Sequence, residues 1–357
     1  MWRAAALVVA CLNVAATMSG GLASGALDGV PSRPALTFTQ FQGQRASWHS
    51  AVWVAAADGS HARKIATHDA YQGSLSPDGR WLTFERSSTT AMSWLFVIEL
   101  TTGHTRRLGK TTGDERWAPA AARFAVSQPG GFFLIDPASG MRKKLLAARV
   151  DSFDFTPDGG SIVLAKDSGV PYEPTERSDL FQLRLSDQAL TRLTRDGHSK
   201  RPLVSRKGIV YVRFKNVPYP RYETWQMRRD GSRQRLVARC CEGPTDTYAN
   251  SPYGFTTIGL STDGTRLLAC MPSEFACIPI AIDLPGGRQH EFRNLGKVGT
   301  PQEVAWTLDL TADGRTALVF IRPANDGPGP WLLYAVPFKG GKPTLLARNA
   351  LDGHWRR

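Results

Sequence analysis

The stretch SPDGRWLTF, residues 76–84, joins a Pro-Asp-Gly turn to a run in which apolar and polar residues alternate. Proline presets the backbone for a tight turn, and glycine adopts the left-handed conformation that such turns require. The alternation that follows is typical of a β-strand with one buried face. Near-copies occur at residues 156–164 (TPDGGSIVL), 261–269 (STDGTRLLA) and 311–319 (TADGRTALV), so the stretch belongs to a repeated unit.

Two weaker copies complete the series. WAPAAARFAV (117–126) and VSRKGIVYV (204–212) fill the two longest gaps, and the copies are then spaced by roughly 40 to 55 residues. Each copy is followed by a second β-hairpin, for example LFVIELTTGHTRRLG at residues 95–109. One unit therefore contains four strands, named a, b, c and d in chain order. Four-stranded units of this length are typical of a β-propeller.

The two ends of the chain together form one more unit. ALTFTQF (35–41) matches strand b, AVWVAAADGSHARKIA (51–66) matches the c–d hairpin, and NALDGHW (349–355) repeats the turn and supplies strand a. The sequence therefore predicts an all-β, seven-bladed propeller over residues 27–357, a single domain whose first blade is closed by strands from both termini. Such closure leaves only short, protected sheet edges. A six-bladed ring with an N-terminal extension is the alternative.

Residues 1–26 (MWRAAALVVACLNVAATMSGGLASGA) have the composition of a secretory signal peptide. One cation, Arg3, precedes an apolar run from Ala4 to Ala16, and small residues follow the run. We therefore expect a periplasmic or secreted bacterial protein; in an alternative interpretation, Cys11 is the acylated residue of a lipoprotein. No later stretch approaches the roughly 20 apolar residues of a membrane helix, so we expect no membrane span in the mature chain.

Four cysteines follow the leader, and in an exported protein we expect them to form disulfides. They are Cys240, Cys241, Cys270 and Cys277. One arrangement joins Cys240 and Cys241 separately to Cys270 and Cys277, which ties two blades together. The other combines a Cys270–Cys277 bond with a vicinal Cys240–Cys241 bond. The first is preferred because a vicinal bridge closes a strained ring.

The net charge of +13 indicates an anionic partner. Basic clusters occur at Arg142-Lys143-Lys144, Lys200-Arg201 and Arg228-Arg229. In an exported protein the partners that suit such clusters are anionic glycans, phospholipid headgroups or acidic proteins. No segment resembles a nucleic-acid-binding module, so we do not expect nucleic acid as a partner.

The repeat resembles a known family. The pattern S-P-D-G-x-x-[apolar]-x-F, followed by a hairpin with a D/T-G turn and a terminal R-L or K-I, is similar to the TolB-type propeller repeat, also called the WD40-like or PD40 repeat. The resemblance covers about residues 35–355. It implies a propeller fold and a partner-binding role like that of the periplasmic TolB propeller. Such repeats also occur in propeller domains of prolyl-oligopeptidase-type peptidases and in many secreted proteins.

Propeller topology assigns the loops to two faces. The a–b and c–d turns lie on one face, here named the turn face, and the b–c loops and d–a links lie on the other, the loop face. The long segments belong to the loop face, for example residues 85–94, 166–179 and 194–202. Loops held by a rigid scaffold commonly carry function, and aromatic and basic side chains suit sugars, anionic groups and peptides. The residues expected to bind a ligand there are Trp94, Trp117, Tyr172, Arg177, Lys200, Arg201, Tyr219, Arg221, Tyr222 and Tyr248.

Sequence motifs for enzymatic chemistry are absent. The chain contains no G-x-S-x-G elbow, no Gly-rich phosphate loop and no H-E-x-x-H. The repeated aspartates lie on separate blades and cannot form an acid–base pair, so they are interpreted as turn residues: Asp78, Asp158, Asp263 and Asp313. We expect no cofactor; His68, His198 and His354 are the candidate ligands if a metal were bound.

Two functions remain open from these patterns. The favoured one is a non-enzymatic, monomeric, exported propeller that binds a cell-envelope protein or an anionic glycan on its loop face. The alternative is a propeller lyase or hydrolase that acts on an acidic polysaccharide and uses a metal held by the loop-face histidines.

Overall fold

The fold is that of a computed structural model. It describes residues 30, 34–42, 49–87, 93–111, 115–148, 150, 152–168, 177–217, 219–239, 256–272, 277–292, 303–323 and 331–356. These residues form strands and turns and contain no helix. No described segment is therefore a helix long and apolar enough to cross a membrane.

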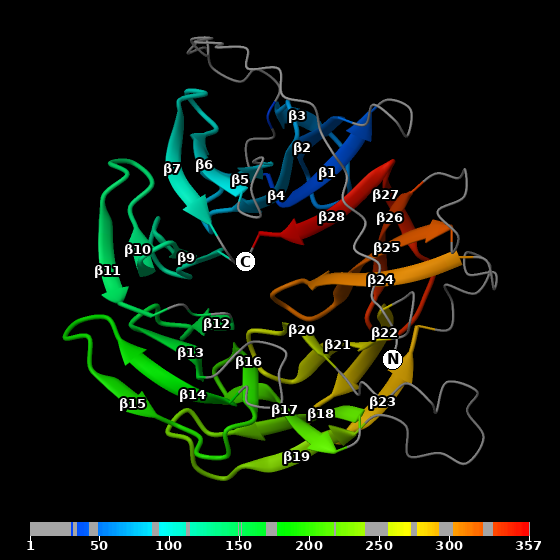
Figure 1. Ribbon diagram of the computed structural model, residues 1–357. Coiled ribbons are helices and arrows are strands. Elements are labelled where there is room, and N and C mark those ends of the chain that lie inside the picture. Colours follow the sequence, from blue (N-terminus) through cyan, green and yellow to red (C-terminus); the bar gives the residue numbers. More distant parts are fainter. Residues whose placement is uncertain are drawn as a thin grey trace, which may run out of the picture.

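The strands form a ring of seven four-stranded antiparallel blades (Figure 1), which confirms the predicted seven-bladed propeller. From the inner to the outer strand, the blades are: blade 1, β28 (Ala350–Trp355), β1 (Leu36–Gln42), β2 (His49–Ala55) and β3 (Arg63–Ala66); blade 2, β4 (Ala70–Leu75), β5 (Trp81–Arg86), β6 (Ser93–Glu99) and β7 (Thr105–Thr111); blade 3, β8 (Glu115–Trp117), β9 (Phe124–Gln128), β10 (Gly131–Ile135) and β11 (Arg142–Leu146); blade 4, β12 (Ser152–Phe155), β13 (Ser161–Ser168), β14 (Arg177–Arg184) and β15 (Leu190–Arg192); blade 5, β16 (Ser199–Val204), β17 (Ile209–Val217), β18 (Tyr219–Met227) and β19 (Arg235–Arg239); blade 6, β20 (Thr256–Leu260), β21 (Arg266–Pro272), β22 (Cys277–Asp283) and β23 (Arg288–Glu291); blade 7, β24 (Glu303–Leu310), β25 (Thr316–Pro323), β26 (Leu332–Pro337) and β27 (Thr344–Arg348).

Both ends of the described chain close blade 1, as expected. Strand β28 pairs antiparallel with β1, and beyond the strand the backbone N–H of Arg356 donates to the carbonyl of Ala35 at 2.9 Å. One detail of the sequence analysis is wrong: residues 350–355 form the strand itself and not a copy of the a–b turn. Gly353 lies opposite Phe38, where a Cβ atom would meet the carbonyl oxygen of Thr37 at 3.0 Å. This glycine therefore permits close packing.

The repeated aspartates cap the a–b turns. In the Asp158 turn, the Thr156 hydroxyl donates to Oδ1 of Asp158 at 2.6 Å, and the backbone N–H of Gly160 donates to the same atom at 3.0 Å. The hydroxyl also accepts the backbone N–H of Ser161 at 3.0 Å. The hydroxyl donor and the backbone donor recur in the other three copies, at Asp78, Asp263 and Asp313. These aspartates are structural.

A β-bulge interrupts the outer strand of five blades, and in blades 1 and 2 it falls at the terminal K-I or R-L of the repeat. In blade 2, Phe96 pairs with Arg107 while Leu95 pairs with Gly109, which leaves Leu108 as the extra residue. Leu108 is buried, at 7% exposure. Bulges at the same step occur in blades 1, 3, 5 and 7. The bulge lets one residue enter the core while the preceding residue stays on the outer surface.

Apolar side chains from neighbouring blades form the core between the sheets. Leu82 and Phe84 of β5 are almost completely buried and pack with Val52 and Val54 of β2. The opening sequence stretch therefore contributes its turn to one face and its alternate apolar residues to the contact between blades 1 and 2.

We expect Asp158→Ala to lower the free energy of unfolding by about 1–2 kcal/mol, because two donors lose a charged acceptor. The Thr156 hydroxyl and the Gly160 N–H lower the pKa of Asp158 below its ordinary 3.8. The contribution of this carboxylate is thus present above pH 3.8 and is lost as the pH falls through the lowered value. Urea unfolding at neutral and acidic pH measures both effects. Asp158→Asn, which keeps an acceptor, is the control, and an alanine variant as stable as wild type would contradict the capping role.

Candidate functional site

The inner strands are interrupted by β-bulges at similar positions. Strands β4, β16, β20, β24 and β28 each contain a step at which the pairing register shifts. At three of the steps the residue has a positive φ without being glycine: Gln72 (51°), Arg201 (49°) and Asp352 (41°). Bulges and left-handed non-glycine residues concentrate at functional sites. Because the inner strands surround the centre of the ring (Figure 1), these residues mark the central wall as a candidate site.

Carboxylates on this wall connect neighbouring blades. Asp309 of β24 accepts the backbone N–H of Trp355 on β28 at 2.9 Å and that of Leu310 at 2.8 Å. Asp154 of β12 repeats the arrangement toward β16, with the backbone N–H of Val204 at 2.8 Å. These two carboxylates are engaged by the backbone, which favours a structural role over acid–base chemistry.

Asp352 is the most unusual of the inner carboxyl groups. Part of the residue reaches solvent, but its Oδ1 atom is inaccessible and has no hydrogen-bond partner among the described residues. Its Oδ2 atom accepts the backbone N–H of Gln72 at 3.3 Å. Burial raises the pKa of Asp352, while the nearby His354 and the Thr39 hydroxyl act in the opposite direction. This carboxyl group is therefore held in a place that disfavours its charge.

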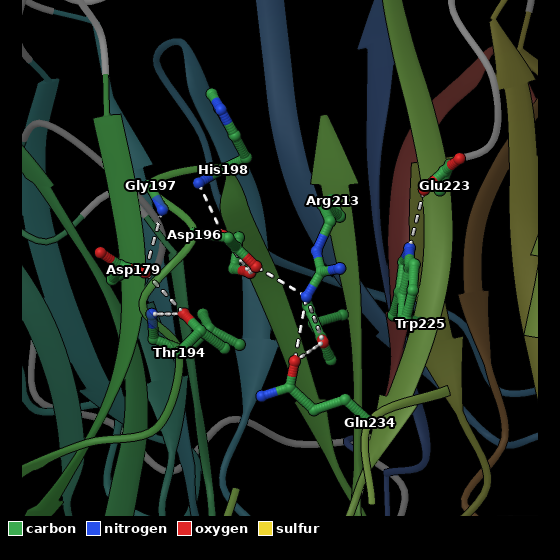
Figure 2. A network of polar contacts seen from close by, with 12 residues as sticks. Asp179, Thr194, Asp196, Gly197, His198, Arg213, Glu223, Trp225 and Gln234 are labelled. Carbon is green, nitrogen blue, oxygen red and sulfur yellow. Dashed lines mark hydrogen bonds and ion pairs between the residues drawn. The ribbon is translucent and has the colours of Figure 1, made fainter. Parts of the chain in front are cut away.

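A second cluster anchors the link between blades 4 and 5 on the loop face (Figure 2). Asp179, which is 8% exposed, accepts the Thr194 hydroxyl at 2.9 Å and the backbone N–H of Gly197 at 3.2 Å. Asp196 lies in the same link, two positions after Thr194. It accepts the backbone N–H of His198 at 2.8 Å and forms an ion pair with Arg213 at 2.7 Å. These contacts hold residues 194–198 immediately before the cations Lys200 and Arg201.

Arg213 is the centre of this cluster. Its guanidinium lies 4.0 Å from the Trp225 ring centroid and donates to the Gln234 side chain at 3.0 Å and to the Tyr211 hydroxyl at 3.3 Å. Burial raises the pKa of Tyr211 to about 12, so the phenol stays protonated at neutral pH. The indole N–H of Trp225 donates to Glu223 at 3.0 Å. A guanidinium with these partners supports the scaffold and is not presented to a ligand.

Three of the predicted binding residues come together on blades 4 and 5. Arg177 packs beside Gly197, Lys200 lies 4.9 Å from the Phe214 ring, and Tyr222 pairs with Phe214 across β17 and β18. Arg201 is exposed at the bulge of the adjoining inner strand. Tyr172 and Tyr248, and the side chains of Tyr219 and Arg221, lie outside the described residues.

The two tryptophans lie elsewhere. Trp94, on β6, has Arg107 at 4.6 Å and Lys110 at 5.4 Å from its ring centroid, so neighbouring cations cover it. Trp117 was expected in a loop-face link, but it ends β8 next to the a–b turn. Its indole N–H donates to the carbonyl of Ser74 at 3.1 Å. Trp117 therefore belongs to the contact between blades 2 and 3.

The three histidines occupy separate places. His68 lies in the link before β4, His198 lies before β16, and His354 lies on β28, where Nδ1 is 3.9 Å from Asp309. Within the described part of the chain, no group of three or more His, Cys, Asp or Glu side chains could hold a metal ion. Of the cysteines, Cys270 is buried, whereas Cys240, Cys241 and the side chain of Cys277 lie outside the description, so their pairing stays a prediction.

Comparisons with solved structures agree with this geometry. No protein-family model and no curated protein sequence matches the chain. TolB from Acinetobacter baumannii aligns with a TM-score of 0.52 and 13% identity, over 92% of this chain and 69% of TolB. The β-propeller domain of the Trilobed protease from Pyrococcus furiosus gives 0.60 and 12%, over 88% and 93%. An oligogalacturonate lyase in complex with manganese gives 0.56 and 13%, over 89% and 86%. At these identities the likeness concerns the fold, and the chain has the fold of a TolB-like propeller.

Asp352→Asn is expected to stabilise the protein at neutral pH. A raised pKa in the folded state means that ionising Asp352 costs stability as the pH rises above its ordinary 3.8. Removing the charge should therefore raise the free energy of unfolding at pH 7, by about 1 kcal/mol, and change it less near pH 4. Urea unfolding at both values measures the difference.

A matched control is Asp187→Asn. The backbone N–H of Ala189, followed by Arg184, lowers the pKa of Asp187, so its charge stabilises the folded state at neutral pH. The sign of the pH effect should be opposite to that at Asp352. A destabilised Asp352→Asn at pH 7 would show that its carboxylate is satisfied in the folded protein.

Proposed function

We propose that the protein is an exported binding module that recognises a cell-envelope protein or an anionic envelope ligand on its loop face. The observation that carries the proposal is the anchored link between blades 4 and 5. Asp179, Asp196 and their partners hold its backbone directly before Lys200 and Arg201. Cations presented from a preorganised backbone lose less conformational entropy when they bind an anionic group.

The bulge in β16 supports the same place. Arg201 has a positive φ and is exposed, and its backbone N–H donates to the Ser152 hydroxyl of blade 4 at 3.1 Å. Lys200 and Arg201 thus lie on the inner strand of blade 5, and Arg177 of blade 4 packs beside Gly197 of the link that precedes this strand. The TolB-like fold agrees with the partner-binding role that the resemblance of the repeat implies.

The lyase alternative has weaker support. A neighbouring structure is an oligogalacturonate lyase with manganese, but the identity of 13% concerns the fold. The candidate histidines of this chain come from separate parts of the ring, and the inner carboxylates Asp154 and Asp309 accept backbone N–H groups. We therefore favour binding over catalysis.

Export and disulfide formation form part of the proposal. Residues 1–26 fit a secretory leader, and an oxidising compartment would allow the four later cysteines to pair. We expect the mature N-terminus near Ala26 and peptides that link Cys240 or Cys241 to Cys270 or Cys277. Mass spectrometry of the periplasmic protein, with and without reduction, measures both. A vicinal Cys240–Cys241 peptide would reverse the preferred pairing, and an intact leader would contradict export.

Lys200→Gln with Arg201→Gln should reduce recovery of an envelope partner about tenfold, the size expected for losing two interface residues that together contribute about 1.4 kcal/mol. Capture from envelope extract followed by quantitative mass spectrometry compares this variant with wild type. Raising the salt concentration should weaken the wild-type interaction because the contact is between charges.

The matched control is Lys339→Gln with Lys342→Gln. These exposed lysines flank the c–d turn of blade 7 on the turn face, so the variant loses the same charge at the opposite face. Equal recovery by wild type and the loop-face variant, with both folded, would refute the proposed site. Equal loss in both variants would mean that net charge alone governs binding.

A further inference from the structure

The outer strands of six of the seven blades carry cations and no carboxylate, and in blade 6 one arginine is balanced by one glutamate. In order from blade 1 to blade 7 their sequences are RKIA, TRRLGKT, RKKLL, LTR, RLVAR, RQHE and TLLAR, and their one carboxylate is Glu291. They form the circumference of the disc (Figure 1). This surface, here named the rim, is distinct from both the loop face and the turn face.

Protection of sheet edges does not account for the sign of this charge. An outer strand leaves unpaired backbone groups, and charged residues keep it from pairing with another chain. A carboxylate would repel a second copy as well as a cation does. The excess of cations on most of the outer strands creates a positive field, which attracts anionic partners and raises the rate of encounter.

The rim charge is densest on β7 and β11, the adjoining outer strands of blades 2 and 3. They carry Arg106, Arg107, Lys110, Arg142, Lys143 and Lys144. Among the described residues none of these six cations forms an ion pair. Elsewhere, by contrast, Arg192 pairs with Asp179 at 2.6 Å and Arg184 with Asp187 at 3.0 Å.

The partners of these cations are neutral. Arg106 donates to the carbonyls of Ser139 and Ala138, and Arg142 donates to the Gln128 side chain at 3.2 Å. Arg107 and Lys110 lie over the Trp94 ring. The carboxylate that Arg106 influences is Asp136 of the nearby turn, whose pKa is lowered chiefly by the Ser139 backbone N–H. The cations are thus positioned without being neutralised.

Charge is separated radially through the blades. The described side chains of the inner strands include the carboxylates Glu115, Asp154, Asp309 and Asp352 and the cations Arg116, Lys200 and Arg201. Positive charge is therefore concentrated at the rim, whereas carboxylates and cations are mixed along the central wall.

We propose that the rim, centred on β7 and β11, binds a linear acidic polysaccharide. The cations follow a convex circumference, which a flat lipid surface meets along only one or two blades. A flexible chain with a negative group on successive sugars can follow the curve across several outer strands and release counterions at each contact. The rim residues are separate from the loop-face residues. An experiment can therefore refute binding at the rim without refuting the proposed function, and the reverse also holds.

The test uses Arg107→Gln with Lys143→Gln and Lys144→Gln, three exposed positions on β7 and β11. Binding to fluorescein-labelled heparin and to polygalacturonate is measured by anisotropy at about 50 mM salt and at higher salt. We expect affinity to fall about tenfold or more, with a shallower dependence on salt concentration, because fewer counterions are released. If the triple variant does not fold, the single variant Lys143→Glu is measured in the same assay and should also bind the polysaccharides more weakly than wild type.

Lys339→Gln with Lys342→Gln and Arg315→Gln is the control for net charge, since these exposed residues lie in the turns of blade 7 and not on its outer strand. The control and the loop-face variant should bind the polysaccharides within about threefold of wild type. Absence of wild-type binding, or equal loss in the rim variant and the control, would overturn the proposal. So would binding to phosphatidylglycerol vesicles with no binding to either polysaccharide, which would identify a lipid surface as the partner.

Discussion

Closure of the propeller ring depends on the hydrogen bonds between β28 and β1, which join the two ends of the chain in one blade. Six blades are built from consecutive strands, but blade 1 obtains its inner strand from the other end of the chain. That strand packs against β4 and β24, the inner strands of the two neighbouring blades. Because β28 also carries Asp352 and His354, closure of the ring and assembly of the central wall depend on the same six residues.

The radial order of each blade explains where its polar groups are placed. Inner strands crowd around the centre, so their carboxylates, such as Asp154 and Asp309, accept backbone N–H groups from the next blade. Outer strands face solvent along one edge and carry cations over aromatic rings, as Arg107 does over Trp94. The result is one architecture with three surfaces of different character: a turn face, a loop face and a basic rim.

The repeat made most of the fold predictable, because a turn that must adopt a left-handed backbone and an alternation that must bury one face leave a strong local signature. Asp158 and its three counterparts were assigned correctly as turn residues for this reason. The assignment of residues 349–355 as a turn copy failed because Asp352-Gly353 imitates the Asp-Gly pair while lying within a strand. Trp117 was misplaced because a three-residue strand has too few positions to show alternation.

The sequence by itself determined the class of fold and the structural role of the aspartates, since each follows from local turn chemistry and a repeating period. It favoured seven blades over six, and the strand pairing confirmed seven. Lys200 and Arg201 were assigned to the link of residues 194–202, whereas they lie in the inner strand β16. Only the tertiary structure decided that the Arg213 guanidinium contacts Asp196, Trp225 and Gln234 within the protein. It also decided that burial raises the pKa of Asp352. These properties arise from β-bulges and from contacts between blades, and neither leaves a pattern in the residues of one strand.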